Sequence, residues 1–264
     1  MIQIIMKKTI LALAVLGVVG TAQAAVIGGQ SYTETGGIRI GTATFGEPGK
    51  PGVGVEGQLF NKLAPASHFA FDKYQDSTGV YQWSGQEIVA EGDAPGSEGP
   101  GPDHSALGVW SFAQVGSQDV WFGEWDAEST TSEIGSKVAG THTVWYNGEN
   151  GDVATTLPTT APVTYTVRSI NSYAGSALPT STLTANFASG AASSTGDIGF
   201  TDGTISIVGS DVRMTATGVS VTSASGTDGN LEGQFYGTGA AGVAGIVTFP
   251  DRAKDTAFGG SKNP

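Results

Sequence analysis

Apolar and polar side chains alternate in short runs along the second half of the chain. Period-two runs of this kind, separated by turn residues, predict half-buried β-strands. About eight such runs fit an antiparallel up-and-down barrel, because closure of the barrel leaves no exposed strand edge. The runs are Thr141–Tyr146, Val163–Val167, Leu183–Phe187, Ile205–Ile207, Val212–Ala216, Val219–Val221, Leu231–Phe235 and Val243–Phe249.

The first half of the chain has a different pattern. Two irregular stretches rich in Gly, Pro and acidic residues, 46–57 and 90–103, interrupt it. Irregular segments of this length inside a compact domain are usually functional loops. We therefore expect a mainly β protein, with an N-terminal β-rich ligand-binding domain at 25–137 and a C-terminal eight-stranded antiparallel β-barrel at 138–264. The N-terminal part holds two of the three histidines and most of the tryptophans: His68, His104, Trp83, Trp110, Trp121 and Trp125.

The N-terminus has the pattern of a secretory signal peptide over residues 1–24. Positive charge at Lys7 and Lys8 precedes an apolar stretch at 9–20, and residues 22–24 fit the small-residue cleavage pattern. The apolar stretch is too short to span a bilayer. We expect the mature chain to begin at Ala25 and to be a secreted, soluble protein without a membrane anchor.

Composition narrows the possible functions. The chain has no cysteine, which excludes disulfides, cysteine-bound metals and a lipidated cysteine. Its formal net charge is −12. This charge excludes nucleic acid as a partner, because the two would repel each other.

Two short signatures near the C-terminus resemble those of a known family of surface proteins. The sequence reads Gly-Gln-Phe-Tyr-Gly at 233–237 and Phe-Gly-Gly-Ser-Lys at 258–262. Similar signatures occur in the C-terminal barrels of transferrin-binding-protein-like surface proteins, and the resemblance covers roughly residues 138–264. The whole plan, with an export signal, a ligand domain, a barrel and no lipidated cysteine, resembles the hemophilins. These are secreted haem-binding proteins related to that family.

The resemblance implies a hemophore that serves iron and haem acquisition. In such a protein the N-terminal domain captures haem b non-covalently through an axial histidine. The resemblance also implies export through the periplasm and outer membrane by a Slam-type translocator that recognises the barrel. It further implies delivery of haem to a TonB-dependent outer-membrane receptor.

A haem iron in a chain without cysteine needs a histidine, methionine or tyrosine ligand. His104 is the first candidate, because it ends the acidic loop directly before the strand-like run Leu107–Phe112. A loop held by a strand can present an imidazole to a flat ligand, and Asp103 is placed in the sequence to orient the ring. The alternative for His104 is a solvated loop histidine.

His68 is the second candidate ligand, for a six-coordinate iron. It stands beside Phe69 and Phe71, and the faces of a porphyrin need apolar and aromatic walls. The alternative for His68 is a packed, hydrogen-bonded core histidine. Haem propionates are anionic, so the lysines on either side of His68 are the candidate propionate partners. These lysines are Lys62 and Lys73, and Tyr74 is a further candidate for the pocket.

Other chemistry-bearing residues favour structural roles. His142 falls in the first predicted barrel strand. Gly52–Gly57 spells a dinucleotide-binding fingerprint, but no predicted strand precedes it and no helix follows it. Asp103-His104-Ser105 are sequence neighbours, which is not the geometry of a catalytic triad. We therefore do not expect an enzyme.

A second hypothesis belongs to another class, that of a protein-binding or host-interaction factor built on the same barrel. The tryptophan-rich half would then be the interface, since tryptophan is enriched at binding hot spots. A third hypothesis is a different metal-containing or hydrophobic ligand in the same cleft. Replacement of His68 and His104 separates the first two hypotheses, because only haem binding depends on these side chains.

Overall fold

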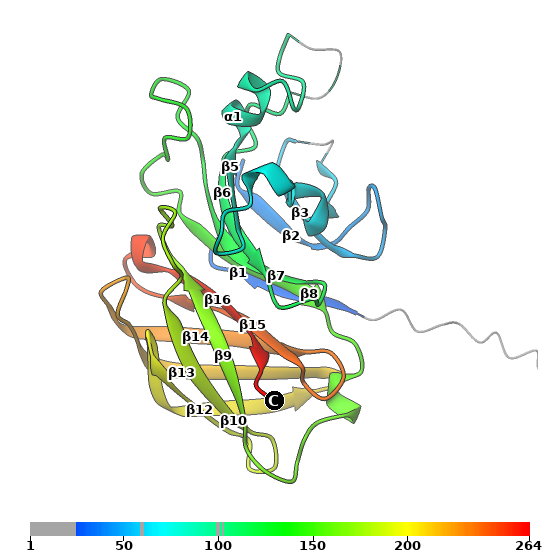
Figure 1. Ribbon diagram of the computed structural model, residues 1–264, viewed down its shortest axis with the longest axis vertical. Coiled ribbons are helices and arrows are strands. Elements are labelled where there is room, and N and C mark those ends of the chain that lie inside the picture. Colours follow the sequence, from blue (N-terminus) through cyan, green and yellow to red (C-terminus); the bar gives the residue numbers. More distant parts are fainter. Residues whose placement is uncertain (1–24, 59–60, 99–100, 102) are drawn as a thin grey trace, which may run out of the picture.

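The computed structural model describes residues 25–58, 61–98, 101 and 103–264 (Figure 1). The protein is mainly β, as expected, and contains a five-stranded sheet, a three-stranded sheet and a closed barrel. The expected signal peptide, residues 1–24, lies outside the described residues. None of the helices in the described part of the chain is long and apolar enough to cross a membrane.

The five-stranded sheet forms the middle layer of the molecule. All its neighbouring strands are antiparallel. In spatial order the strands are β1 (Val26–Gln30), β8 (Thr143–Glu149), β7 (Val120–Asp126), β6 (Val109–Gln114) and β5 (Val80–Ser84). Strands β1 and β5 are therefore the two edges of this sheet.

A smaller layer covers one face of the five-stranded sheet (Figure 1). It consists of a three-stranded antiparallel sheet and three short helices. All five tryptophans of the chain are buried in the cluster between these layers. The elements are β2 (Ile38–Thr42), β3 (Pro51–Val55), β4 (Ala64–Pro65), η2 (Ala66–Phe69), η3 (Asp72–Tyr74) and α1 (Gly85–Ala90).

Helix α1 begins at a capping box directly after edge strand β5. The Ser84 hydroxyl accepts a hydrogen bond from the backbone N–H of Glu87 at 3.1 Å, and the Glu87 carboxylate accepts one from the backbone N–H of Ser84 at 3.2 Å. These two bonds satisfy backbone donors that the helix itself leaves unpaired. The chain therefore turns sharply from the edge strand into the loop that carries His104.

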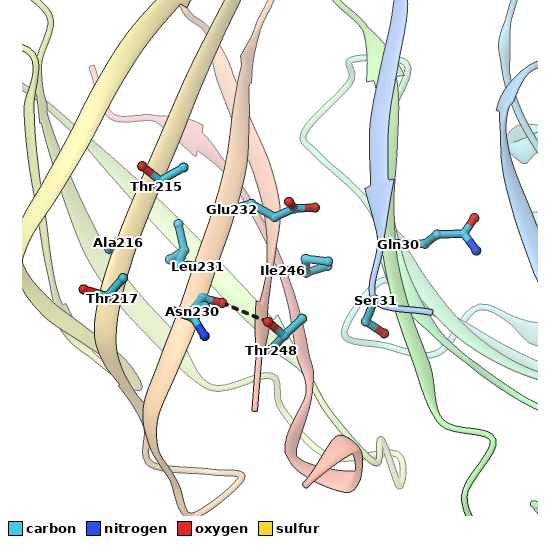
Figure 2. A pocket seen from close by; sticks show the side chains of 10 residues that line it. All are labelled: Gln30, Ser31, Thr215, Ala216, Thr217, Asn230, Leu231, Glu232, Ile246 and Thr248. Carbon is cyan, nitrogen blue, oxygen red and sulfur yellow. Dashed lines mark hydrogen bonds between the residues drawn. The ribbon is translucent and has the colours of Figure 1, made fainter. Parts of the chain in front are cut away.

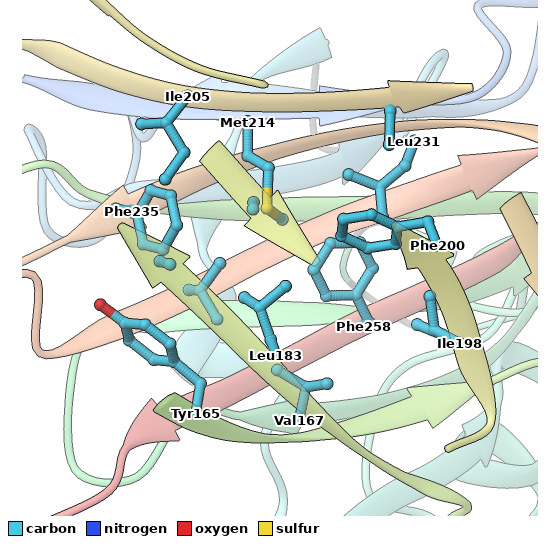
Figure 3. Packing of buried hydrophobic residues seen from close by; sticks show 14 of the residues in the cluster. Tyr165, Val167, Leu183, Ile198, Phe200, Ile205, Met214, Leu231, Phe235 and Phe258 are labelled. Atoms are coloured by element: carbon cyan, nitrogen blue, oxygen red, sulfur yellow. The ribbon is translucent and has the colours of Figure 1, made fainter. Parts of the chain in front are cut away.

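The C-terminal part is a closed antiparallel barrel of eight strands, as expected, in which β16 pairs with β9. Figure 3 shows that its interior is filled by side chains such as Val167, Leu183 and Phe258. This filling is typical of eight-stranded barrels. The strands are β9 (Val163–Ile170), β10 (Thr180–Asn186), β11 (Ala191–Gly196), β12 (Ile198–Val208), β13 (Asp211–Val221), β14 (Gly226–Tyr236), β15 (Gly242–Thr248) and β16 (Thr256–Lys262).

The first predicted barrel strand is wrong. The run Thr141–Tyr146 lies mostly in β8, which pairs with β7 and β1 in the five-stranded sheet. Alternation indicates a strand but does not tell which sheet the strand joins. The passage from sheet to barrel therefore lies after Glu149, not at Val138, and the barrel begins at Val163.

The predicted number of barrel strands, eight, is confirmed, but three further strands differ from the runs that were predicted. The runs Val212–Ala216 and Val219–Val221 are parts of one strand, β13, whose pairing with β14 shifts register beside Gly218. A bulge of this kind interrupts the alternation of side chains. Strands β11 and β16 escaped prediction because they are rich in Ala, Ser and Gly.

The second face of the five-stranded sheet packs on the outside of the barrel. Phe122 and Val144 of the sheet lie in one buried cluster with Ile246 and Ala257 of β15 and β16. The C-terminal signatures lie at this contact. A Cβ atom at Gly259 would be only 2.3 Å from the Phe122 ring, so the sheet can approach β16 closely only over a glycine.

Tyr236, from the other signature, ties the barrel to edge strand β1. It is fully buried, and its hydroxyl donates a hydrogen bond to the carbonyl of Ile27 at 2.8 Å. The neighbouring Phe235 points into the barrel core (Figure 3). The signature therefore places one aromatic ring on each side of the barrel wall.

His142 has a structural position at the same contact. Its Nδ1 lies 3.3 Å from the Asp126 carboxylate, and its Nε2 lies 3.0 Å from the carbonyl of Asp255. Both partners are acceptors, so the doubly protonated imidazolium satisfies both. Burial alone lowers the pKa of His142, but the Asp126 hydrogen bond and the charges of Glu124 and Asp126 outweigh it and raise the pKa above its usual value.

We predict that Gly259→Ala weakens the contact between sheet and barrel. The added methyl group would collide with the Phe122 ring, and overpacking of this kind costs about 1–3 kcal/mol of unfolding free energy. Denaturant unfolding of the two variants measures the cost. Gly199→Ala in β12 is the control, because the atom nearest its Cβ is the flexible Ser220 hydroxyl. Equal losses in both variants would contradict the close approach.

We also predict a pH-dependent contribution from His142. A raised pKa in the folded state stabilises the protein fully below pH 6.5, and this contribution is lost as the pH rises through the folded pKa. As the pH rises above 6.5 and through the folded pKa, wild type should therefore lose more stability than His142→Gln.

Unfolding free energies at several pH values provide the measurement. The comparison with a variant is needed because a second group, Asp255, also titrates. Burial raises the pKa of Asp255 to about 6, and its titration changes stability in the same direction. Parallel pH profiles for wild type and His142→Gln would show that folding does not raise the pKa of His142.

Candidate functional site

Phe69, Phe71 and Tyr74 lie beside edge strand β5, where aromatic rings form a stack. Trp83 of β5 and Trp110 of β6 have ring centroids 5.5 Å apart. Phe69 of η2 stacks on Trp83 at 5.9 Å and on Trp110 at 5.4 Å. The Trp83 indole donates a hydrogen bond to the Phe69 carbonyl at 2.9 Å. These contacts fix η2 over the face of the sheet.

Phe71 extends the stack to the surface. It is 37% exposed, and it meets Trp83 at 5.7 Å and Tyr74 at 6.2 Å, both edge to face. A partly exposed aromatic ring backed by buried rings is a suitable wall for a flat apolar ligand. The structure thus brings together Phe69, Phe71 and Tyr74, as the sequence analysis grouped them.

Lys73 and Tyr74 of η3 are held by two acidic residues that the sequence did not single out. The Lys73 ammonium bonds the carboxylates of Glu91 and Asp93 and lies 4.7 Å from the centroid of the Tyr74 ring. The Tyr74 hydroxyl donates to Asp93 at 2.9 Å and to Glu91 at 3.1 Å. The hydrogen bonds that Lys73 donates to Asp93 and Glu91 raise its pKa. A propionate would have to compete with these carboxylates for Lys73.

His104 lies half-buried in the loop that returns to β6. Its Nδ1 is 3.0 Å from the Pro95 carbonyl, which also accepts the backbone N–H of His104 at 3.0 Å. A carbonyl can only accept, so Nδ1 is the protonated nitrogen of the neutral imidazole, and Nε2 then carries the lone pair. This is the tautomer that binds a metal through Nε2.

Asp103 does not orient the ring, contrary to the sequence prediction. Its Oδ1 accepts hydrogen bonds from the backbone N–H and hydroxyl of Ser105, at 2.9 and 2.7 Å. Asp103 therefore shapes the turn, and the Pro95 carbonyl holds the imidazole. The contact between Pro95 and His104 could not be predicted from the sequence, because the two residues are nine positions apart.

A cavity of 350 Å³ adjoins the His104 loop. Ser105 and Ala106 line it together with Gln86 of α1 and Trp125 of β7. The loop packs closely on α1, since a Cβ at Gly85 would lie 2.5 Å from the His104 carbonyl. His104 is thus placed next to a space of the size that small ligands occupy.

His68 is exposed, which rules out a packed core histidine. Its side chain is 41% accessible, and its Nε2 lies 3.5 Å from the Glu47 carboxylate. Its ring lies over Gly46, where a Cβ would be 2.6 Å from the imidazole Cε1. To ligate iron through Nε2, His68 must leave Glu47.

The two candidate ligands are not joined by any hydrogen bond or ion pair among the described residues. Both segments nevertheless contact the end of β5, His68 through its neighbour Phe69 and His104 through Gly85. Lys62 lies on the His68 side, 6.0 Å from the centroid of the Phe45 ring.

The described residues contain no group of three or more His, Asp or Glu side chains suited to a bare metal ion. A haem iron needs only one or two protein ligands.

Trp83 and Trp110 are the residues that sequence reasoning missed as parts of the wall. Trp83 alternates with Tyr81, and Trp110 with Phe112, so all four belong to the same buried cluster. That alternation was the available signal. Because Trp83, Trp110, Trp121 and Trp125 are at most 3% exposed, they do not form the exposed interface that the protein-binding hypothesis needs.

A larger groove, of 430 Å³, lies elsewhere, between β1 and the outside of the barrel (Figure 2). Hydroxyl, amide and carboxyl side chains dominate it, and it contains neither a histidine nor an aromatic ring. It therefore lacks the groups that would hold a porphyrin. Its lining residues are Gln30, Ser31, Thr215, Ala216, Thr217, Asn230, Leu231, Glu232, Ile246 and Thr248.

Comparison with known families agrees with this division of the molecule. The HphA N-terminal heme-binding domain matches residues 21–143, and the HphA C-terminal domain matches residues 155–262. The chain belongs to the HphA family, the hemophilins. It is a haem-binding protein, and the resemblance seen in the sequence is confirmed. Residues 144–154 lie between the two matched regions and include most of β8, the last strand of the sheet before barrel strand β9.

Several solved structures are also similar to this chain. A variant of Transferrin Binding Protein B from Actinobacillus pleuropneumoniae is 15% identical, with 91% of this chain and 100% of that chain covered and a TM-score of 0.42. The protein of the same name from serogroup B Neisseria meningitidis is 13% identical, with 60% and 33% covered and a TM-score of 0.39. The N-lobe of Lactoferrin Binding Protein B from Moraxella bovis is 13% identical, with 75% and 84% covered and a TM-score of 0.34. The matches span about a third of the first transferrin-binding proteins.

We predict that Phe69→Ala strongly destabilises the haem-free protein, whereas Phe71→Ala does not. Phe69 is 5% exposed and stacks on two tryptophans, so its truncation should cost about 3–5 kcal/mol. Phe71 is partly exposed and leaves little empty volume when truncated. Chemical unfolding followed by tryptophan fluorescence measures both, and similar losses would mean that Phe71 is also part of the core.

Proposed function

We propose that this protein is a secreted hemophore that captures haem b reversibly at the β5 edge and passes it to a TonB-dependent outer-membrane receptor. The observation that carries the proposal is the hydrogen bond from His104 Nδ1 to the Pro95 carbonyl. In the neutral imidazole this bond sets the tautomer whose Nε2 can bind iron, and the cavity of 350 Å³ adjoins the next residue, Ser105.

His104 is the proposed first axial ligand and His68 the proposed second. Phe69, Phe71 and Tyr74 are the proposed aromatic walls. Haem, when bound, supplies an iron with two axial positions that imidazole nitrogens can fill. The chain's contribution would be to keep the proton of the neutral His104 imidazole on Nδ1, which leaves the lone pair on Nε2, and to exclude water with aromatic rings.

Lys62 and Lys73 are the proposed propionate partners, and they differ in what binding requires. Lys62 makes no ion pair within the described part of the chain, whereas Lys73 is paired with Glu91 and Asp93. An anionic propionate must therefore compete for Lys73 with two carboxylates. We infer that Lys62 is the readier partner.

We propose that the protein captures haem without changing it chemically. The proposed histidine ligands bind the iron and form no covalent link to the porphyrin. A bond from one or two imidazoles, without a covalent link, permits release to a receptor. Export through the periplasm and outer membrane by a Slam-type translocator completes the proposal. It is supported by the signal-peptide pattern at residues 1–24 and by membership of the hemophilins.

Haemin titration of the purified mature protein, followed at the Soret band, tests the site. Wild type should give a saturable shift at one haem per chain, and His104→Ala should abolish it or leave only weak binding. His68→Ala should weaken binding less and change the spectrum of a six-coordinate haem. His142→Gln is the matched histidine control and should bind as wild type does. Full binding by His104→Ala would overturn the assignment of the first ligand.

A further inference from the structure

The loop between β9 and β10, residues 171–179, reaches from the barrel into the haem-binding domain. The backbone N–H groups of Ser172 and Tyr173 donate to the carboxylate of Glu124, at 2.5 and 2.9 Å. Glu124 belongs to β7 and is fully buried. A buried carboxylate with two backbone donors and Lys137 at 2.9 Å makes a fixed anchor for the loop.

The Tyr173 side chain continues from this anchor to a turn next to the candidate site. Its hydroxyl bonds the Asp76 carboxylate and lies 2.9 Å from the Thr78 hydroxyl. Asp76 also accepts the backbone N–H groups of Thr78 and Val80, at 2.8 and 3.2 Å. Asp76 thus closes the turn 76–79 from within, and Tyr173 holds it from the barrel.

A second barrel residue holds the same turn. Arg168 of β9 donates from Nη1 to the Thr78 carbonyl at 2.9 Å. Burial raises the pKa of Tyr173, which keeps its hydroxyl protonated as a donor to Asp76. Gln82 of β5 in turn donates to the Tyr173 carbonyl at 3.2 Å. The contact therefore runs in both directions between the domains.

The turn 76–79 connects the two sides of the candidate haem site. Before it lies η3, with Lys73 and Tyr74, and after it lies β5, with Trp83. A shift of the turn moves η3 relative to the aromatic wall. We propose that Tyr173 is a positioning residue, through which the barrel fixes η3 against β5 and slows the loss of haem. This inference rests on the proposed site.

The experiment compares Tyr173→Phe with Tyr165→Phe in the full chain. Both variants lose one hydroxyl from a barrel tyrosine, and the Tyr165 hydroxyl bonds the Ala240 carbonyl at 2.7 Å inside the barrel. Transfer of haem to excess apomyoglobin gives the dissociation rate. We expect Tyr173→Phe to lose haem on the order of tenfold faster, because a hydrogen bond to a charged group is removed. Tyr165→Phe should lose haem at the wild-type rate.

Hydrogen exchange on the haem-free proteins gives a readout that does not depend on haem. Residues 72–81 should exchange faster in Tyr173→Phe than in Tyr165→Phe. Asp76→Asn should resemble Tyr173→Phe, and the double variant should add little, since the two residues share one bond. A barrel residue with a merely structural role would change neither the local exchange nor the haem loss.

The outcomes separate this inference from the proposed function. If wild type takes up no haem, the proposed function fails, and faster exchange of residues 72–81 still supports the positioning of η3. If wild type binds haem but Tyr173→Phe and Tyr165→Phe release it equally fast, the inference is overturned. Unchanged exchange of residues 72–81 in Tyr173→Phe would overturn it as well.

Discussion

The burial of both faces of the five-stranded sheet is the constraint on which the rest of the structure depends. On β7, Trp121 and Trp125 pack into the aromatic cluster, while Val120 and Phe122 pack toward the barrel. A strand that is apolar on both faces cannot leave either face to solvent. The three-stranded sheet and the barrel each cover one of them. The barrel therefore covers one face of the sheet of the ligand-binding domain and is also a domain of its own.

Polar groups determine how the two covered faces are aligned. Apolar contact between a sheet and a barrel is not directional, whereas hydrogen bonds to Glu124, His142 and Tyr236 have fixed geometry. Each of these groups is buried and paired across the contact, as buried polar groups must be. Their pairing explains how an interface of ordinary side chains can hold one orientation, and how the loop at 171–179 can reach a defined turn in the other domain.

The sequence predicted the class of fold and the number of barrel strands because alternation and turn residues are local properties. It failed where a property was not local. The membership of β8 depends on its partners β1 and β7, and β16 shows no alternation because Gly259 makes room for Phe122. The same holds for the site. The pairing of Phe69 with Phe71 beside a histidine was visible in the sequence, whereas the Pro95 carbonyl beside His104 and the carboxylates around Lys73 come from other segments.

The position of the candidate site at an edge strand is compatible with both a rigid wall and the proposed release of haem. Strand β5 pairs with β6 on one side only, and η3, which precedes it in the chain, contains no buried residue. Segments with few neighbours open at a lower free energy than the core does. The rings of Trp83 and Trp110 stay packed in the sheet layer, and they can keep their shape while the flanking segments move. A wall fixed by the core, and a cover, η3, that is held by exposed ion pairs and by the turn 76–79, suit the proposed capture and release of haem. The bond between Tyr173 and Asp76 places the control of that cover in the barrel.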